Sequence, residues 1–460
     1  MAPLSKAGAA LDALRDDLVG AVLAPADPGY DEARSVFNAV IDRRPAVIAQ
    51  CADATDVVRA VRFGRELDLP IAVRGGGHSV AGAALGDGAL VVDLRRMREV
   101  SVDPAAEAVR IEGGATMSHL DRATEPYGLA TTGGRVSTTG VGGFVLGGGT
   151  GWLDRAFGLA ADNLLGVELV TADAERVHAC ADENPELFWA LHGGGGNFGV
   201  ATALTLRLHE LPEFSVVLLL HLPESGPDAV RTFREVIADG PDELGGAVLY
   251  GSGPPAEFVP QGLVGRPLCG VLLTYAGAED DLRKLAAPLL ALPHEVELAG
   301  DMPYADVQCM LDVPSGLRNH WSAECLTGLP DESVDVFCAR ADGMPVPTGC
   351  RHLLFPQGGA IAAGPREYPV PYRDAPWAAH PFAVWEDPAD DERATGWVRD
   401  VCAGLRPWST GAVHLNFIGD EGPERVRAGL GAGNTLRLEK VKRRYDPDNV
   451  FRFNHNIRPV

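Results

Sequence analysis

The chain of 460 residues is poor in lysine, has no paired cysteine motif and has no long hydrophobic run. Lysine occurs only four times, and an excess of Asp and Glu leaves a net charge of −23, which repels phosphate backbones. We therefore expect no nucleic-acid partner. The eight cysteines are scattered without a C-x-x-C pair or a zinc-ligand spacing, so we expect reduced thiols and no metal site.

Membrane and export signals are also missing from the sequence. The longest apolar run, residues 216–220, is far too short to span a bilayer, and the first residues carry no apolar signal-peptide core. We expect a cytoplasmic protein that makes no membrane contact and is a monomer or a homodimer.

Glycine is what the chain has in excess. Its 55 Gly and 34 Pro make up about a fifth of the residues, while 46% hydrophobic content favours a loop-rich globular protein over disorder. The glycines cluster in residues 74–79, 139–152 and 192–199. Glycine reaches positive φ and leaves its N–H uncovered, so successive amides can converge on a phosphate. A large anionic cofactor would suit such loops, although any single cluster is as compatible with a tight turn or a close strand crossing.

Two common nucleotide motifs are excluded by context. Gly194, Gly196 and Gly199 satisfy G-x-G-x-x-G, but a helix is predicted before them and a strand after them. The dinucleotide fingerprint requires the opposite order, strand and then helix. No G-x-x-x-x-G-K-[ST] sequence exists, so a P-loop is excluded as well.

The pattern of apolar residues divides the chain into three parts. Residues 1–208 alternate strand and helix signals, with strands expected at 46–50, 70–73, 89–93, 108–111, 166–171, 176–180 and 200–208 and helices after Asp53 or Thr55, at 117–127 and at 187–191. Residues 209–410 are typical of an antiparallel sheet, with strands at 216–222, 270–274 and 352–355 and helices at 228–238 and 280–292. Residues 411–460 contain a helix that starts at Asn434 or Thr435 and a tail too apolar to be free, so we expect the tail to pack on the first part.

Four ordered motifs carry a family resemblance. They are Val-Arg-Gly-Gly-Gly-His-Ser at 73–79, the Gly-rich run 140–149 with Trp152 and Asp-Asn-Leu at 162–164, Leu-Phe-Trp-Ala-Leu followed by the Gly run to 199, and Tyr-Asp-Pro-Asp-Asn at 445–449 with Asn454 and Asn456. This set, over residues 25–460, resembles the berberine bridge enzyme-like flavoprotein oxidases of the vanillyl-alcohol oxidase and p-cresol methylhydroxylase superfamily. The resemblance implies an α+β fold in which a two-part FAD-binding domain, residues 1–208 and 411–460, encloses an inserted antiparallel-sheet substrate domain, residues 209–410.

The resemblance also implies the residues that hold FAD. His78 matches the histidine that bonds to the 8α carbon of the flavin, and a neutral imidazole is a competent nucleophile for that bond. The other implied cofactor-binding residues are Arg74, Gly75, Gly76, Gly77, Ser79, Gly82, Thr138, Thr139, Gly142, Gly143, Trp152, Asp162, Asn163, Val200, Asn454 and Asn456. Val136 stands where bicovalent members carry a cysteine, so we expect a single histidyl link and no cysteinyl link, as in bacterial members.

The catalytic base departs from the family pattern. The carboxylate and the tyrosine that relatives often use are replaced here by His352 and His414, and an unperturbed imidazole can act as a base near neutral pH. Each has an alternative interpretation: His414 could only bond the flavin edge, and His352 could be a solvent-facing strand residue. Thr139 is expected near flavin N5, where it would influence oxygen access. Weaker candidates are Tyr304, Arg318, His320, Glu324 and Glu386.

The predicted function is an FAD-dependent oxidase of a small cyclic or aromatic secondary metabolite. Hydride passes to flavin N5, and O2 then reoxidises the flavin to give H2O2. The alternatives are a flavin-N5-oxide oxygenase of natural-product biosynthesis and a flavin-binding protein whose catalytic residues have decayed. Arg74, Arg135, Arg155 and Arg351 lie in or beside segments expected to line the cleft, so the acidic composition gives no reason to expect a cationic substrate.

Overall fold

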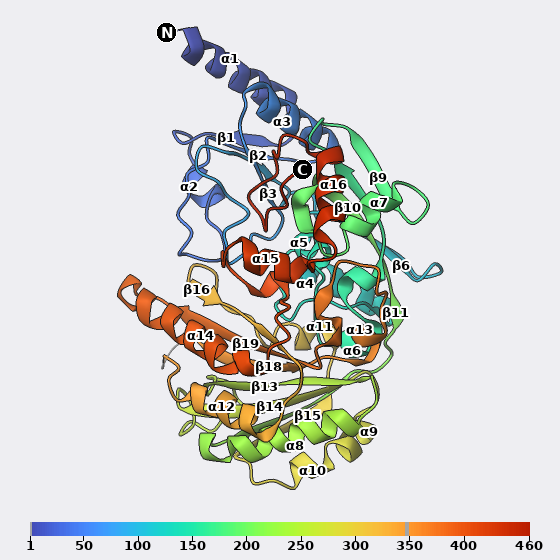
Figure 1. Ribbon diagram of the computed structural model, residues 1–460, viewed down its shortest axis with the longest axis vertical. Coiled ribbons are helices and arrows are strands. Elements are labelled where there is room, and N and C mark those ends of the chain that lie inside the picture. Colours follow the sequence, from blue (N-terminus) through green and yellow to red (C-terminus); the bar gives the residue numbers. More distant parts are fainter. Residues whose placement is uncertain (1, 346–348) are drawn as a thin grey trace.

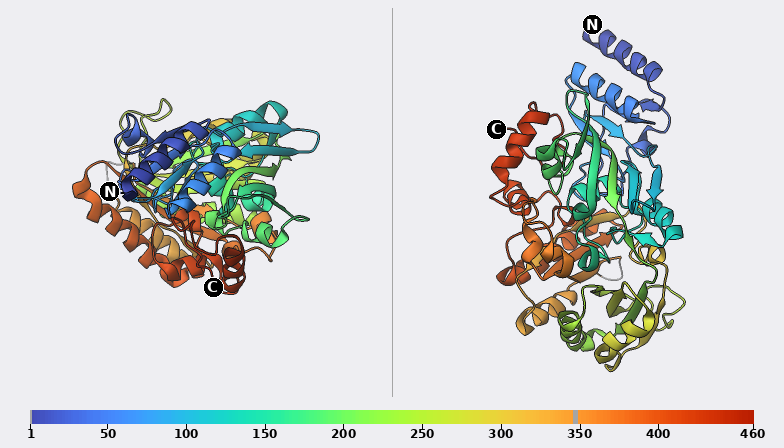
Figure 2. Two further views of the ribbon diagram at one scale, coloured as in Figure 1. Left: turned by 90° about the horizontal axis from the view of Figure 1, so that it is seen from above. Right: turned by 90° about the vertical axis from the view of Figure 1, so that its right-hand side faces the viewer.

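The computed structural model describes residues 2–345 and 349–460. Its two chain ends and the first third of the sequence lie together, and the sheet formed by the middle of the sequence lies below them (Figure 1). The side view in Figure 2 shows the same division, with the C-terminal helices packed beside the N-terminal part. No helix in the described part of the chain has the length and apolarity that crossing a bilayer requires.

A small four-stranded sheet opens the first part. Its strands are β1 (Ala21–Leu23), β2 (Val47–Gln50), β3 (Ile71–Arg74) and β4 (Leu90–Asp93), in the order β1-β2-β4-β3 with β4 parallel to both β2 and β3. Helix α3 (Ala54–Glu66) starts where the Asp53 carboxylate accepts the N–H groups of Thr55 and Asp56, as the sequence predicted. The first glycine cluster, residues 75–79, follows β3 directly and therefore leaves the sheet at the carboxyl end of that strand.

A five-stranded antiparallel sheet packs next to it. Its strands are β5 (Val100–Asp103), β6 (Ala108–Glu112), β8 (Leu164–Val170), β9 (Arg176–Cys180) and β10 (Val200–Arg207), in the order β5-β6-β10-β8-β9; β7 (Leu129–Ala130) pairs separately with β11 (His209–Glu210). Helices α4 (Met117–Thr124), α5 (Val141–Leu146) and α7 (Pro185–Ala190) pack around it. The hairpin of β8 and β9 and the order helix, glycines, strand at residues 185–207 agree with the predictions.

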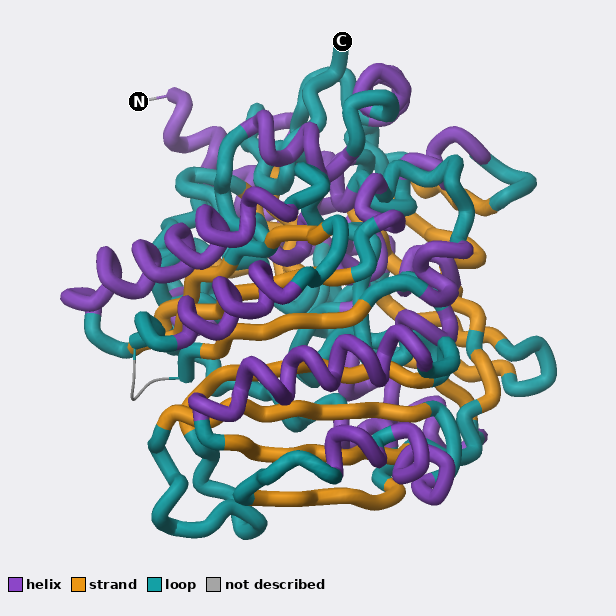
Figure 3. Tube along the Cα trace, turned by 60° about the horizontal axis from the view of Figure 1, so that its bottom comes forward, coloured by secondary structure: helices purple, strands orange, loops and turns teal. Residues whose placement is uncertain are grey.

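The middle of the chain forms the large antiparallel sheet. Its strands are β12 (Ser215–His221), β13 (Leu244–Ser252), β14 (Pro267–Tyr275), β15 (Val296–Asp301), β16 (Arg318–Trp321), β18 (Arg351–Pro356) and β19 (Trp377–Trp385), in the order β15-β12-β14-β13-β18-β19-β16, and β17 (Glu324–Leu326) also pairs with β19. One face is covered by α8 (Gly226–Asp239), α9 (Glu279–Leu285), α10 (Ala287–Leu290), α12 (Asp331–Ala341) and α14 (Asp391–Leu405), as Figure 3 shows. The other face turns toward the glycine loops.

The remaining elements are short or terminal. They are α1 (Ala2–Asp17), α2 (Tyr30–Ala33), α6 (Asp154–Phe157), α11 (Tyr304–Val307), α13 (Gly359–Ala363), α15 (Pro423–Leu430) and α16 (Thr435–Tyr445). The tail packs back onto the first part, as predicted: the Lys442 ammonium is fully buried, pairs with Asp446 at 2.6 Å and donates to the carbonyls of Asn197 and Phe451. The predicted division at residues 208 and 410 into separate folding units stays a prediction.

Candidate active site

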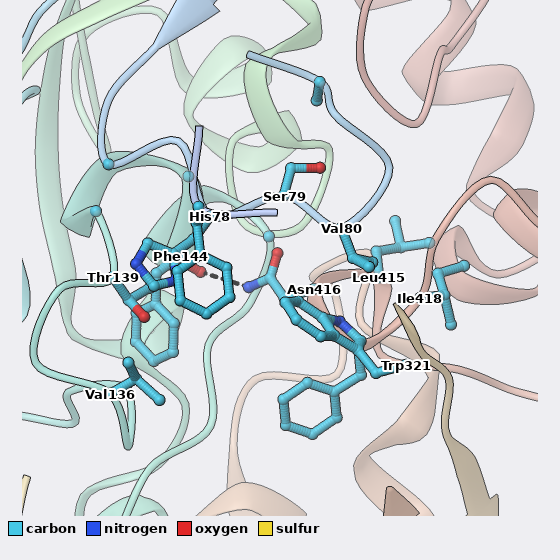
Figure 4. Close-up of a pocket in the computed structure, with 18 of the residues that line it drawn as sticks. His78, Ser79, Val80, Val136, Thr139, Phe144, Trp321, Leu415, Asn416 and Ile418 are labelled. Atoms are coloured by element: carbon cyan, nitrogen blue, oxygen red, sulfur yellow. Dashed lines mark hydrogen bonds between the residues drawn. The ribbon is translucent and has the colours of Figure 1, made fainter. Parts of the chain in front are cut away.

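A cavity of about 320 Å³ lies between the glycine loops and the large sheet. The loops after β3 and before α5 form one wall, together with the glycines at 193–195 and the C-terminal residues Asn454 and His455. Figure 4 shows His78, Phe144 and Thr139 gathered on one side, with Trp321, Leu415 and Ile418 across from them. Two of these walls are tied together by the Asn416 amide, which donates to the Phe144 carbonyl at 2.9 Å.

Glycine is required where the first two loops touch. A Cβ added to Gly76 would lie 2.3 Å from the backbone nitrogen of Gly140, and a Cβ on Gly140 would lie 2.3 Å from that of Gly76. Gly143 differs, because an added Cβ there would meet no protein atom within 4 Å and would point into the cavity. The glycines thus bring two backbone segments together and leave the cavity side bare, which is the form of a cradle for a bound group.

His78 lies in the first loop and faces the second. Its Nε2 is 2.9 Å from the Thr138 hydroxyl, and its ring stacks on Phe37 with centroids 4.1 Å apart. Burial lowers the pKa of His78 to about 4, so the imidazole is neutral at physiological pH. The Thr138 hydroxyl can donate to Nε2 or accept from it, and in either tautomer the neutral ring keeps a lone pair on one nitrogen.

Aromatic rings form the opposite wall. Trp321 stacks on Phe382 at 4.7 Å and approaches Phe37 at 6.3 Å, while Phe417 stacks on His380 at 4.3 Å. All of these residues line the cavity. Flat faces on both sides suit planar ring systems, since offset stacking adds to the area that a ring buries.

The sheet face supplies an imidazole that the sequence prediction missed. His380 on β19 donates its Nδ1–H to the Ser322 carbonyl at 2.8 Å, because a carbonyl can only accept. In the neutral ring the lone pair is therefore on Nε2, and no group of the described residues bonds to that atom. Burial lowers the pKa of His380 to about 4, and the neighbouring Arg135 acts in the same direction. His380 is thus a neutral acceptor in the cavity wall.

The charged side chains of the lining are all cationic. Arg135 and Arg351 line the cavity, and no carboxylate of the described residues does. Arg135 is held by the Gly151 carbonyl at 2.6 Å and by Asp154 at 3.2 Å, with its guanidinium 4.0 Å from the centre of the Phe355 ring. The cavity therefore has the opposite sign to the protein as a whole.

The predicted cofactor-binding residues fall into two groups. Eight line the cavity, and Thr138 reaches it through His78; the eight are Gly75, Gly76, Gly77, His78, Ser79, Thr139, Gly143 and Asn454. The others do not line it: Arg74, Gly82, Gly142, Trp152, Asp162, Asn163, Val200 and Asn456. Among these, the half-buried Asn456 has a side-chain carbonyl without a hydrogen-bond partner in the described part of the chain. Arg74 donates to the carbonyls of Ala33 and Ser35, and Asp162 is paired with Arg373.

Neither predicted base reaches the cavity. His352 on β18 is fully buried on the helix-covered face, where its Nε2–H donates to the Phe337 carbonyl at 3.1 Å and its ring lies 3.9 Å from that of Phe337. His414 is also fully buried, packed between Tyr372 at 5.0 Å and Phe417 at 4.6 Å. Burial lowers both pKa values to about 3. Neither residue lines the cavity, so the geometry does not support either one as the base, and that role stays a prediction.

The weaker candidates also lie elsewhere. Arg318 is paired with Asp391, and the buried Glu324 is bonded to Ser409 and Arg425. Tyr304 is on the wall of a second cavity near Asp121, His320 is next to Trp321 on β16 without lining the main cavity, and Glu386 is exposed.

Strand alternation places Arg351, which the sequence predicted beside the cleft, and not His352, on the cavity face of β18. Successive side chains of a strand face opposite sides, so Arg351, Leu353 and Phe355 face the cavity while His352 faces the helices. The pairing of β18 with β19 sets Leu353 opposite His380 and Arg351 opposite Phe382. The signal for β19 was obscured by Pro381 in its middle, since proline argues against a central strand.

The residues present fit FAD. The bare glycine backbone accepts a phosphate-bearing chain, the aromatic walls accept a flat ring, and the buried Asn454 side-chain carbonyl has no hydrogen-bond partner among the described residues. A buried acceptor of this kind calls for a ligand N–H, which both the flavin and the adenine ring provide. No described cysteine lines the cavity, and Val136 does.

Comparisons with known proteins agree with this geometry. Residues 45–179 match the model described as FAD binding domain, and residues 415–458 match the model described as berberine and berberine like. The chain is 31% identical to (R)-6-hydroxynicotine oxidase of Paenarthrobacter nicotinovorans over 96% of its length and 97% of that protein. It is 30% identical to an FAD-linked oxidoreductase of Aspergillus terreus over 92% of its length and 90% of that protein.

Solved structures have the same architecture. The crystal structure of 6-hydroxy-D-nicotine oxidase from Arthrobacter nicotinovorans superposes with a TM-score of 0.86 at 28% identity, covering 96% of this chain and 99% of that one. A berberine bridge enzyme-like protein of Physcomitrella patens superposes with a TM-score of 0.87 at 22% identity, covering 98% and 99%, which is a likeness of fold.

Proposed function

This chain belongs to the berberine bridge enzyme-like family of FAD-linked oxidoreductases, and from that premise we propose that it is an oxidase of a small aromatic or cyclic metabolite with His380 as its base. The observation that carries the proposal is the placement of His78 and His380 in one cavity, on opposite walls, with aromatic rings on both sides. When bound, FAD would supply a hydride acceptor and a path for two electrons to O2, with hydrogen peroxide as the reduced product.

In this proposal His380 has the role of base that was predicted for His352 and His414. A base must be unprotonated, and it must be within reach of a substrate O–H or N–H. The Ser322 carbonyl fixes the Nδ1 proton and leaves Nε2 as the acceptor, and the depressed pKa keeps the ring neutral over the physiological range. His380 would hold the substrate proton at Nε2 while a C–H hydride leaves.

The substrate class rests on the cavity walls. Phe37, Trp321, Phe382 and Phe417 line the cavity, and an aromatic lining favours an aromatic or flat cyclic substrate over a flexible chain. Two of the proteins to which the chain is similar are named as oxidases of 6-hydroxynicotine, which contains such a ring. Thr139, which lines the cavity, would influence oxygen access.

We also propose a single covalent link between FAD and His78. The neutral ring, the Thr138 hydroxyl at 2.9 Å and the absence of a described cysteine from the lining support one histidyl bond and no cysteinyl bond. The link would keep the cofactor bound through turnover.

The test is an anaerobic screen of aromatic alcohols, hydroxylated heteroaromatics and cyclic amines for bleaching of the protein-bound flavin. A substrate that bleaches it and then yields one equivalent of peroxide per product in air supports the oxidase. Incorporation of ¹⁸O from labelled O2 into product would replace the oxidase with an oxygenase. Failure of every compound, in a protein that carries FAD and is bleached by dithionite, would favour the decayed flavin-binding protein.

A further inference from the structure

Arg351 is the charged residue of the cavity that makes no direct ion pair with a described carboxylate, although the nearby Asp312 attracts it through space. Its Nη1 donates to the Leu311 carbonyl at 2.6 Å, and no carboxylate of the described residues lies within the 4.0 Å limit of an ion pair. The nearby Asp312 is engaged elsewhere, since its oxygens accept the Ser137 N–H at 2.8 Å and the Ser137 hydroxyl at 2.6 Å. Nε and Nη2 of Arg351 have no partner among the described residues.

Arg135, in the same cavity, is a buried guanidinium whose positive charge is balanced by neighbouring protein groups. It pairs with Asp154, bonds to Thr150 and Gly151, and has an aromatic ring beneath it. Burial costs free energy for any cation, and a counter-charge offsets that cost. Arg351 has only the attraction of Asp312, without a direct ion pair, to offset this cost, and burial lowers its pKa to about 10, which still leaves it charged at neutral pH.

The position of Arg351 relates it to the reacting part of the cavity. It is opposite Phe382 in the β18–β19 pairing, and His380 is two residues before Phe382 on the same face. Diagonal neighbours of this kind are about 7–8 Å apart at the backbone, within reach of long side chains. Arg351 and His380 can therefore contact two parts of one small aromatic molecule.

We propose that Arg351 is an anion subsite that binds a carboxylate of the substrate, so that the molecule oxidised here is an aromatic or cyclic carboxylic acid. This inference rests on the proposed function in one respect, namely that the bound molecule is the one oxidised. The guanidinium fork matches a carboxylate bidentately, and such charge-assisted bonds are about twice as strong as neutral ones.

The cofactor is a poorer partner for Arg351 than the substrate. The phosphates of FAD suit the bare amides of the glycine loops, and those loops form the wall opposite β18. Arg351 belongs to the large sheet, whose cavity face also provides His380, Phe355 and Phe382. The Arg351 guanidinium thus lies on the sheet side of the cavity, across from the glycine loops that suit the phosphates of FAD.

The test compares benzoate with its neutral isostere benzamide. Each is titrated by calorimetry and by the absorbance change of the bound flavin into the wild-type holoprotein and into the R351Q, R351K and R318Q variants. R318Q is the matched control because Arg318 lies on the same sheet, outside the cavity, and is paired with Asp391. Benzoate should bind the wild type and R318Q at least tenfold more tightly than benzamide does. R351Q should lose about thirtyfold or more in benzoate affinity and keep its affinity for benzamide, with R351K between the two.

Two results would overturn the proposal. One is equal binding of benzoate and benzamide to the wild type, and the other is a benzoate preference that survives in R351Q. A third outcome, in which R351Q alters the absorbance of the free holoprotein but leaves benzoate binding intact, would assign the charge to the flavin and also refute the subsite. Calorimetry requires neither turnover nor oxygen, so failure of the proposed oxidase activity would be seen separately, in the bleaching and peroxide assays.

Discussion

Adding a methyl group to Gly143 should weaken FAD binding without harming the fold. Gly143 lies in α5 and is exposed to the cavity, and a Cβ built there meets no protein atom within 4 Å. The apoprotein of Gly143→Ala therefore meets no clash, and replacing a helical glycine by alanine stabilises by about 0.5–1 kcal/mol. For a chain of this length we expect a rise in Tm of about 1 °C or less.

The cost of the same methyl group should appear when the cofactor binds. If the flavin or its phosphate chain fills the space beside Gly143, the Cβ overpacks the site, which costs about 1–3 kcal/mol, or roughly five- to a hundredfold in Kd. Covalent attachment would hide this loss. The measurement is therefore made in a His78→Ala background, by fluorescence titration of apoprotein with FAD.

Gly142 is the matched control because it is the preceding residue of the same helix. A Cβ on Gly142 points into the protein, 3.3 Å from the Gly113 carbonyl oxygen, and does not enter the cavity. Gly142→Ala should bind FAD within about twofold of the parent. If Gly143→Ala binds FAD as well as Gly142→Ala does, the assignment of this cavity to the cofactor is refuted.

Three further predictions concern titratable groups. His78→Ala should lack the FAD mass increment and the in-gel flavin fluorescence of the denatured wild type, and Thr138→Val should slow attachment because the ring loses the hydroxyl that orients it. His380→Asn keeps a donor for the Ser322 carbonyl but loses the base, so kcat/KM should fall about 10²–10⁴-fold. In the wild-type enzyme, kcat/KM should decline on the acid side with a midpoint near pH 4, because protonation of His380 removes its lone pair. Asp121→Asn should raise Tm relative to the wild type, and the rise should be larger at pH 8 than at pH 5. Burial raises the pKa of the Asp121 carboxyl to about 8, so ionisation of this group at higher pH destabilises the folded wild type. The stability lost by the wild type is about 1.4 kcal/mol per pH unit between the unfolded and folded pKa values.

Each of these has an outcome that contradicts it. A mass increment that persists in His78→Ala would move the covalent link to another residue. An acidic limb near pH 6.5, or full activity in His380→Asn, would remove that histidine from the chemistry. A Tm difference between Asp121→Asn and the wild type that is the same at both pH values would mean that the carboxyl group is ionised in the fold.

The sequence predicted the parts of the fold that local signals determine. Asp53 caps α3 because its carboxylate reaches free N–H groups of the first turn, and β8 and β9 pair because a short turn separates two apolar runs. The predicted helix at 280–292 is instead divided into α9 and α10, with Pro288 in the first turn of the second helix, where proline is tolerated. Helix α5 was not predicted, since glycines disfavour a helix, and packing of Phe144, Val145 and Leu146 into the core stabilises it.

The cofactor side of the site was easier to predict than the substrate side. The glycine loops hold a group through backbone atoms, so their sequence is itself the signal, and eight of the predicted residues line the cavity. Asp162 and Asn163 were placed there by resemblance alone, and the structure gives them protein partners in Arg373 and His209. A residue whose role depends on which segments meet in space leaves no such local pattern.

The choice between His352 and its neighbours shows where sequence reasoning fails in physical terms. Neighbouring side chains of a strand lie on opposite faces of the sheet. On β18, His352 therefore faces Phe337 and the helices, and the adjacent Arg351 faces the cavity. The proposed base comes from the paired strand, where the register sets His380 opposite Leu353. That pairing brings His380 to the face on which Arg351 already lies, so the proposed base and the proposed anion-binding residue are neighbours in the cavity wall. A slip of β19 by one residue would turn His380 away from the cavity and leave Arg351, which belongs to β18, in place.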